Sequence, residues 1–234
     1  MTPAQQNQTK LTNPEQVPFL CSQAMLVRKI MLDMFNGYGC LSGAFSVVEL
    51  YVALYLGHWS ARKTASGNAR RLRVLPKGTS TLAFYATLHA AGLIEAEQLK
   101  HYGTAKLPCL LHAGTAGSDA TLYTLGPTLG TAVGIALASK LKRTPYSVIC
   151  FMGDGELQEH VDQAAKCAAG WGLDNLSIVV DCNRQQSYYP IEYGDPTMME
   201  GPSGQLDLVR QFWQSCGWHV VEIDGHDFPA ILEA

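Results

Sequence analysis

Two short apolar runs with one helical pattern between them are the feature that most constrains the fold. The runs are "SVICFM" and "LSIVVD", and the segment "ELQEHVDQAAKCAAGWG" between them has apolar residues at helical spacing. A strand, a helix and a second strand in this order form a parallel crossover, because a short turn cannot join parallel strands. The alternation recurs in "RVLPKG" before "TSTLAFYATLHAAG" and in "LDLVRQFWQSCG" before "WHVVEIDG". We therefore predict an α/β fold whose parallel sheet has helices on both faces.

The first part of the chain follows a purely helical pattern. The segments "FLCSQAMLVRKIMLDMF" and "SVVELYVALYLGHW" repeat apolar residues at helical spacing. Ser46 and Glu49 predict a capping box at the start of the second helix. Residues 1–15 form a polar tail. The chain has 234 residues, and 47% of them are apolar. This length and composition suffice for one large hydrophobic core. We therefore predict a single domain over residues 16–234.

Charge and cysteine content exclude several classes of protein. The net charge is −3 and only 16% of the residues are charged, so the chain lacks the basic surface that binds nucleic acid or an anionic membrane. The seven cysteines are odd in number and lack CxxC spacing, which is typical of reduced thiols in the cytoplasm. The sequence contains no signal-peptide core and no apolar run near the roughly 20 residues that span a bilayer. We predict a cytoplasmic protein whose partners are small molecules or other proteins.

An acidic, glycine-rich turn follows the first of the two apolar runs. Gly153 and Gly155 flank Asp154, and Asn183 follows the second run. The carboxyl ends of parallel strands meet at one edge of a sheet, where ligands bind. Carboxylate and amide oxygens suit Mg²⁺, so Asp154 and Asn183 predict a metal site that neutralises a diphosphate. The alternative is a tight turn with a helix-capping acid, but residues 156–182 have the length that one helix and one strand require.

Several segments resemble one enzyme family. The segment "GDGELQEHVDQAAKCAAGWGLDNLSIVVDCNRQQ" resembles the thiamine diphosphate signature of transketolases. The segments "RVLPKGTSTLAFYATLHAAGL", "LGPTLGTAVGIALASKLK" and "GWHVVEIDGHD" are similar to other transketolase segments, in the same order. The resemblance implies a thiamine diphosphate-binding fold and, within it, the diphosphate-binding domain.

The resemblance also implies a ligand set for the metal and the cofactor. Asp154, Asn183 and the backbone carbonyl of Gln185 would hold Mg²⁺, or Ca²⁺ or Mn²⁺ in its place. The implied cofactor-binding residues are Gly126, Gly153, Asp154, Gly155, Glu156 and Asn183. Gly126 matches a glycine whose backbone approaches the diphosphate, with tight packing as the alternative reason for a glycine there.

Four further positions carry the implied catalytic and substrate-lining roles. His112 matches a histidine that contacts donor hydroxyls, and Glu159 matches a glutamate in a polar network that reaches a partner. An exposed helical glutamate is the alternative for Glu159. Cys40 and Thr79 stand where the family has histidines near the substrate. Because cysteine and threonine have less hydrogen-bonding and charge capacity than histidine, we expect a specialised substrate and pathway.

The resemblance covers only the amino-terminal half of a transketolase. The glutamate that activates the cofactor belongs to the pyrimidine-binding half, so we expect a second subunit that carries this half, in a heterotetramer with two copies of each. The expected reaction transfers a two-carbon ketol or acyl unit to an aldehyde-type acceptor. Two alternatives are a 2-oxo-acid dehydrogenase or decarboxylase component, and a non-catalytic half-transketolase that acts as an interaction protein.

Other polar residues have simpler interpretations. Lys77 is either an ion-pair partner at the edge of the core or a phosphate contact, and the sequence does not decide between them. His226 is expected to be structural. The remaining histidines match no metal-ligand spacing and are expected at the surface or in packing contacts: His58, His89, His101, His160 and His219.

Overall fold

The computed structural model describes residues 16–57, 71–115, 120, 125–142, 146–186, 189–190 and 204–234. The predicted tail and His58 lie outside these ranges. The described residues form two compact units. The helical unit takes its residues from Met1–Ala69, Thr79–Cys109 and Val221–Ala234, and the sheet unit from Arg70–Gly78 and Leu110–Val220. The single domain over residues 16–234 stays a prediction.

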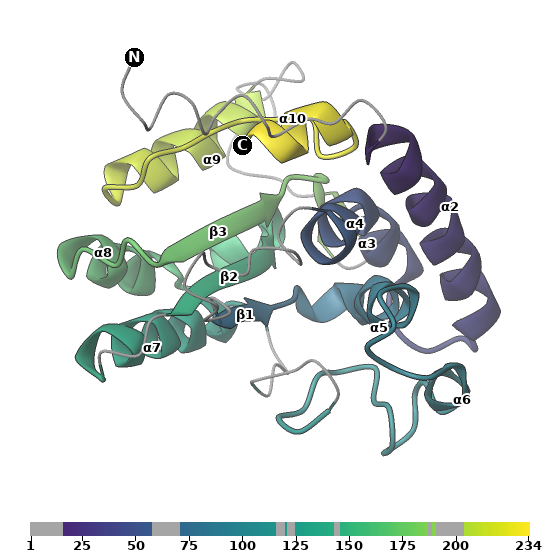
Figure 1. Ribbon diagram of the computed structural model, residues 1–234. Helices are drawn as coiled ribbons and strands as arrows, with labels where there is room; N and C mark the ends of the chain where they lie inside the picture. Colours follow the sequence, from purple (N-terminus) through teal and green to yellow (C-terminus); the bar gives the residue numbers. More distant parts are fainter. Residues whose placement is uncertain are drawn as a thin grey trace, which may run out of the picture. The chain divides into compact units, whose positions relative to one another are not determined.

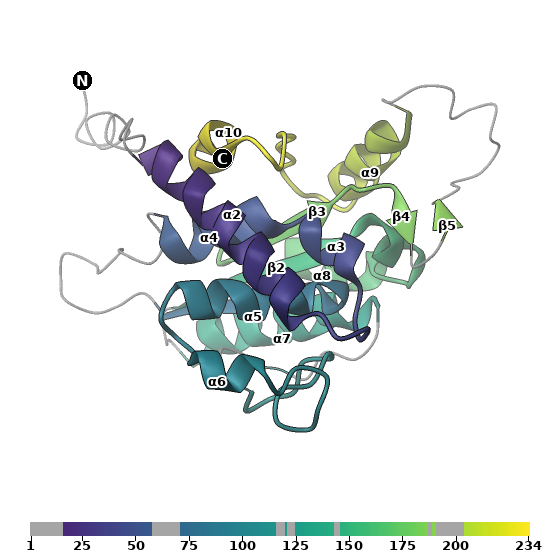
Figure 2. The same ribbon diagram turned by 90° about the vertical axis from the view of Figure 1, so that its right-hand side faces the viewer.

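The helical unit is organised around α5 (Figure 2). Helix α5 contacts α2, α3, α4 and α6. Its residues from Thr81 to Leu88 are all buried, as expected for a helix without a polar face. The helices of this unit are α2 (Gln16–Met34), α3 (Leu41–Phe45), α4 (Val48–Leu56), α5 (Thr81–Ala90), α6 (Ala96–Leu99) and α10 (Phe228–Glu233). The predicted helical N-terminal segment is therefore confirmed.

The start of α4 differs from the prediction. Its N-cap is Val47, which makes no side-chain cap hydrogen bond, and Ser46 is instead the C-cap of α3. The predicted capping box is therefore wrong, because Ser46 and Val47 form the turn between two helices. Glu49 Oε2 instead accepts from Arg28 Nη2 at 2.9 Å and pairs with His226 Nδ1 at 3.0 Å. This contact is consistent with a structural His226, and that interpretation stays a prediction.

The sheet unit is built on three parallel strands in the order β1-β2-β3 (Figure 1). They are β1 (Arg71–Leu75), β2 (Tyr146–Gly153) and β3 (Leu176–Asp181). Leu75 pairs with Cys150, and Gly153 pairs with Asp181. The carboxyl ends of β2 and β3 are therefore in register, as the crossover pattern predicts.

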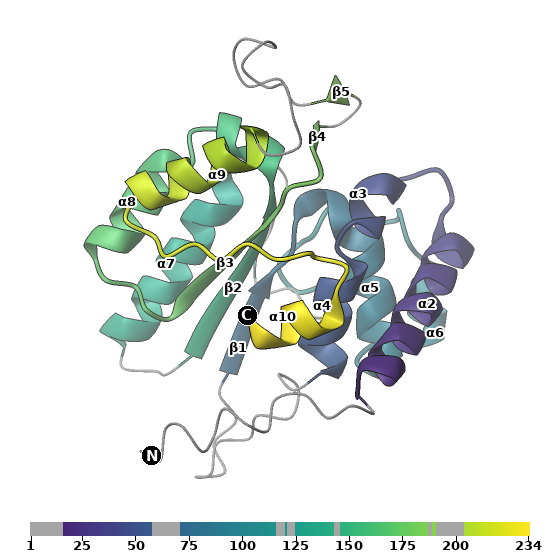
Figure 3. The same ribbon diagram turned by 90° about the horizontal axis from the view of Figure 1, so that it is seen from above.

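Helices α7 (Pro127–Leu141) and α8 (Asp162–Gly170) lie on the same side of this sheet (Figure 3). Helix α7 contacts β2, β3 and α8. The central strand β2 is buried from Val148 to Gly153, which explains its unbroken apolar run. The predicted α/β class and parallel sheet are confirmed.

The unit also contains the 3₁₀ turn η3 (Asp154–Gln158), the short strands β4 (Gln185–Gln186) and β5 (Tyr189–Pro190), and helix α9 (Gly204–Ser215). A further 3₁₀ turn, η2 (Gly78–Ser80), lies where the chain passes between the two units.

The strand predicted in "WHVVEIDG" does not form. Residues 218–224 have no regular secondary structure, and they pair with none of the described strands. The boundary between the two units falls inside this segment, after Val220. Side-chain and turn contacts hold its ends instead, since Trp218 Nε1 donates to the Ala165 carbonyl at 3.0 Å and His226 N donates to Asp224 at 2.8 Å. An apolar run becomes a strand only where a neighbouring strand receives its hydrogen bonds.

All seven cysteines lie in the described ranges, and none forms a disulfide. Among the described helices, none is long and apolar enough to cross a membrane.

Candidate functional site

Asp154 is fully buried where β2 ends and η3 begins. Its Oδ1 accepts the Gly155 N–H at 3.0 Å, and its Oδ2 accepts the Arg184 N–H at 2.9 Å. Arg184 reaches this position with a φ of 59°, which is uncommon for a residue other than glycine. The two loops that follow β2 and β3 are thus joined at this carboxylate.

The burial of Asp154 has an electrostatic cost. Burial raises the pKa of Asp154 to about 6, although the N–H groups of Arg184 and Gly155 act in the opposite direction. A carboxylate in such a place becomes more stable in its charged form when a cation lies beside it. A cation beside Asp154 would therefore offset the cost of its burial.

Glu156 occupies the other side of the same turn. It is 2% exposed, and its two carboxylate oxygens accept the N–H groups of Gly126 at 2.9 Å and Gly153 at 3.0 Å. Burial raises the pKa of Glu156, while these two N–H groups lower it. Glu156 therefore links the residue before α7 to the end of β2. Both glycines are among the predicted cofactor-binding residues, and their N–H groups donate to Glu156.

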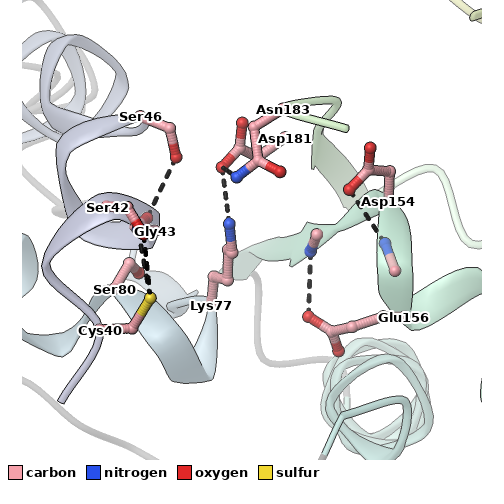
Figure 4. Close-up of polar contacts among 12 residues, drawn as sticks. Cys40, Ser42, Gly43, Ser46, Lys77, Ser80, Asp154, Glu156, Asp181 and Asn183 are labelled. Atoms are coloured by element: carbon pink, nitrogen blue, oxygen red, sulfur yellow. Dashed lines mark hydrogen bonds and ion pairs between the residues drawn. The ribbon is translucent and has the colours of Figure 1, made fainter. Parts of the chain in front are cut away.

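Asn183 lies two residues beyond the end of β3. Its Nδ2 donates to Asp181 Oδ2 at 3.2 Å, and Lys77 Nζ donates to the same oxygen at 2.6 Å (Figure 4). The side chains of Lys77 and Asp181 are 6% and 10% exposed. The ion-pair interpretation of Lys77 is therefore confirmed.

Gln185 begins β4, which contacts η3, so the third proposed metal ligand lies in a segment beside Asp154. Asp154, Asn183 and a backbone carbonyl would all coordinate a metal through oxygen atoms. Oxygen ligands suit Mg²⁺ or Ca²⁺ and not a thiolate-binding metal. Within the described ranges, no group of three or more His, Cys, Asp or Glu side chains is placed to hold a metal. The candidate ligand set has a different make-up, because it combines the Asp154 carboxylate with an amide oxygen of Asn183 and a backbone carbonyl.

Gly126 is required by its backbone and by its neighbours. Its φ is 90°, and a Cβ there would lie 2.6 Å from the Cβ of Glu159 and 2.7 Å from its carbonyl oxygen. The packing alternative therefore accounts for this glycine. The side chain of Glu159 is exposed, as is His112, whose carbonyl accepts the Thr115 N–H in a turn at 3.0 Å.

In the helical unit, Cys40 and Thr79 come together at Gly43. A Cβ on Gly43 would lie 3.1 Å from both Cys40 Sγ and Thr79 Oγ1. Cys40 Sγ accepts the Gly43 N–H at 3.3 Å and so caps α3. Two residues that are far apart in the sequence thus share one small site. The capping bond gives Cys40 a structural role beside the expected substrate-lining one.

Sequence reasoning assigned no role to Asp181 and left Lys77 undecided. The available signal was the position of each residue: Lys77 follows β1 by two residues, and Asp181 ends β3. Their contact depends on the strand order β1-β2-β3, which the order of elements along the chain does not reveal.

Comparisons with known proteins agree on one family. The model of the family described as "Transketolase, thiamine diphosphate binding domain" matches residues 39–234. The chain is 32% identical over 227 residues to the 6-deoxy-6-sulfo-D-fructose transketolase subunit SqwG of Clostridium sp. (strain MSTE9), with 94% of this chain and 79% of that protein covered. It is 29% identical over 206 residues to an apulose-4-phosphate transketolase subunit of Phocaeicola vulgatus, with 83% of this chain and 67% of that protein covered.

Longer relatives match over a smaller part of their length. The chain is 30% identical over 215 residues to transketolase-like protein 2 of Bos taurus. The match covers 89% of this chain but 33% of that protein. The similarity to this longer relative is therefore confined to about a third of its length.

Proposed function

Since the chain belongs to the transketolase family through its thiamine diphosphate-binding domain, we propose that it is the diphosphate- and metal-binding subunit of a two-chain transketolase-like enzyme. The enzyme would transfer a two-carbon ketol or acyl unit to an aldehyde-type acceptor. The observation that carries the proposal is the fully buried Asp154 beside the loop that holds Asn183, at the carboxyl edge of a parallel sheet.

The residues at this edge fit a divalent cation. Asp154, Asn183 and the Gln185 carbonyl offer three oxygen ligands, and Mg²⁺ usually combines one or two carboxylates with phosphate and water oxygens. A cation there would also offset the cost of burying the Asp154 carboxylate, whose pKa burial raises to about 6. We assign Mg²⁺ to these residues, with Ca²⁺ or Mn²⁺ as substitutes.

The chain's own contribution is to bind and orient. Thiamine diphosphate supplies the carbon–carbon bond chemistry when it is bound. Asp154 and Asn183 would hold its diphosphate through the metal, while Glu156 fixes the backbone at Gly126 and Gly153 around that position. Glu156 therefore acts on the shape of the site, and its carboxylate does not need to contact the cofactor.

A second subunit would complete the site. The relatives from Clostridium and Phocaeicola vulgatus are both named as transketolase subunits. These names support a partner that carries the pyrimidine-binding half and its activating glutamate. We propose a cytoplasmic heterotetramer with two copies of each chain, in which Glu159 reaches toward the partner.

The substrate would be specialised. Cys40 and Thr79 share one small site at Gly43, and neither can carry the positive charge of a histidine near neutral pH. The exposed His112 would contact donor hydroxyls. This combination disfavours the ordinary sugar-phosphate donors. Turnover of xylulose 5-phosphate at the rate of a typical transketolase would contradict this part of the proposal.

Purification from the native host in thiamine diphosphate and Mg²⁺, followed by mass spectrometry, tests the two-chain assembly. We expect a stoichiometric partner with a pyrimidine-binding half. A chain that is stable alone and has no such partner would support the non-catalytic interaction protein instead. Product analysis then separates ketol transfer from a 2-oxo-acid decarboxylase, which releases carbon dioxide.

The metal assignment has its own test. The variant Asp154→Ala should abolish metal-dependent binding of thiamine diphosphate. Asp174→Ala is the matched control, because the Asp174 side chain is 85% exposed and pairs only at the surface with Lys140. Equal binding by both variants would refute the proposed site.

A further inference from the structure

We propose that Lys77 and Asp181 are positioning residues that orient Asn183 toward the metal. This inference rests on the proposed function, because it assigns a role to two residues beside the ligand set. It starts from one hydrogen-bonded series, Lys77 Nζ to Asp181 Oδ2 at 2.6 Å and Asn183 Nδ2 to the same oxygen at 3.2 Å.

Lys77 reaches Asp181 by crossing the end of the central strand. It follows β1, whereas Asp181 ends β3, and β2 lies between them. Neighbouring strands are about 4.8 Å apart, so only a long side chain spans from β1 to β3. The crossing point is Gly153, where a Cβ would lie 3.3 Å from Lys77 Cε. Gly153 therefore leaves the space through which the lysine passes.

The contact with Asp181 determines whether the NH₂ group or the oxygen of the Asn183 amide points away from Asp181. An ionised carboxylate only accepts hydrogen bonds, so the Asn183 amide must turn its NH₂ group toward Asp181. Its oxygen then points the other way, to the side on which Asp154 lies (Figure 4). A flipped amide would present NH₂ to a cation, which it cannot coordinate. Asp181 thus selects the orientation in which Asn183 can act as a ligand.

Lys77 in turn fixes Asp181. Because the two side chains are 6% and 10% exposed, their ion pair is largely shielded from water and holds one geometry. Lys77 also neutralises a carboxylate that would otherwise compete with Asp154 for the cation. Groups that orient a metal ligand typically change metal affinity by about 10- to 100-fold when they are removed.

A stabilising ion pair with no further role is the competing explanation, and an apolar replacement separates the two. Replacing both members of a buried pair by apolar residues of similar volume is often neutral or stabilising. The double variant Lys77→Met/Asp181→Leu should therefore fold, while it loses the group that orients Asn183. A second variant, Lys77→Leu/Asp181→Val, repeats the test with smaller side chains if the first does not fold.

The assay measures Mn²⁺ binding by electron paramagnetic resonance, in the presence of thiamine diphosphate, on the full chain with any partner chain that co-purifies. We expect the double variant to bind Mn²⁺ about 10- to 100-fold more weakly than the unchanged chain. The control is Val148→Ala, a cavity in the buried start of β2, about 16 Å along the strand from Gly153. This control should lose thermal stability and keep its Mn²⁺ affinity.

Two other results would overturn the inference in different ways. If the unchanged chain and Asp154→Ala take up Mn²⁺ equally, the proposed metal site fails and this inference fails with it. If Asp154→Ala loses Mn²⁺ but the double variant keeps the affinity of the unchanged chain, the metal site stands and Lys77 and Asp181 are only a structural pair.

Discussion

The variant Gly126→Ala should destabilise the sheet unit, because the glycine is required for two separate reasons. The backbone φ of 90° is one that residues with a Cβ rarely adopt, and the strain of adopting it costs about 2 kcal/mol. The added Cβ would also lie 2.6 Å from the Cβ of Glu159 and 2.7 Å from its carbonyl oxygen. Relieving that overlap costs about 2 kcal/mol more, so we expect a total of about 4 kcal/mol.

A matched control lies in the helix that follows. Gly134 is inside α7, and a Cβ there would meet no atom within 4 Å. The variant Gly134→Ala should therefore stabilise the protein by about 0.5 to 1 kcal/mol through its helix propensity. The two variants make the same chemical change and are expected to have effects of opposite sign.

Thermal unfolding followed by circular dichroism measures both variants. For a chain of this size, 1 kcal/mol shifts Tm by about 2 to 4 °C. Gly126→Ala should thus lower Tm by about 8 to 16 °C, and Gly134→Ala should raise it by about 1 to 4 °C. If Gly126→Ala has the same Tm as the unchanged protein, the packing argument at this turn is refuted.

Two further predictions concern titrating groups. Burial raises the pKa of Cys150, so a thiol reagent should modify the exposed Cys21 and Cys167 in the native protein and Cys150 only after denaturation; rapid labelling of native Cys150 would contradict its position in β2. The pKa of Asp154 rises from 3.8 to about 6 on folding. The folded state therefore binds this proton more tightly, and the stability that Asp154 contributes to the metal-free chain is lost as pH rises from 3.8 to about 6. Mg²⁺ added near pH 6, in weak buffer with thiamine diphosphate, displaces protons from the diphosphate itself, whose last pKa is about 6. The unchanged chain should release more protons than Asp154→Asn because Asp154 adds its own, and equal release would contradict the assignment.

Local patterns predicted the crossover at the centre of the sheet unit. The quoted runs correspond to β2 and β3, and the helical pattern between them contains α8. These elements depend on neighbours in the sequence: apolar residues in unbroken runs, apolar residues at helical spacing, and glycines at the ends. The register that brings Gly153 opposite Asp181 follows from the parallel crossover once both strands are placed.

Interactions that depend on spatial neighbours were not predictable in the same way. Ser46 and Glu49 have the spacing of a capping box, which requires Ser46 to be the N-cap of α4. Because α3 ends at Phe45, Ser46 is instead the C-cap of α3. The apolar residues of 218–224 suit a strand, yet no described strand pairs with them. In both cases the residue types are compatible with the predicted element. The contacts with neighbouring segments determine that a different structure forms.

The three acidic residues at the carboxyl edge of the sheet show why only one of them suits the metal. Asp181 has an ammonium group 2.6 Å from its Oδ2, so its charge is already neutralised. Glu156 uses both oxygens on the N–H groups of Gly126 and Gly153, and a metal there would have to displace these hydrogen bonds. Asp154 accepts hydrogen bonds from the two loops that flank the proposed ligand position. Its pKa is raised because burial disfavours the charged carboxylate, and a nearby cation would offset that effect. Loss of metal affinity should accordingly be complete in Asp154→Ala and partial in the apolar replacement of Lys77 and Asp181, because the first removes a ligand and the second removes only the orientation of another.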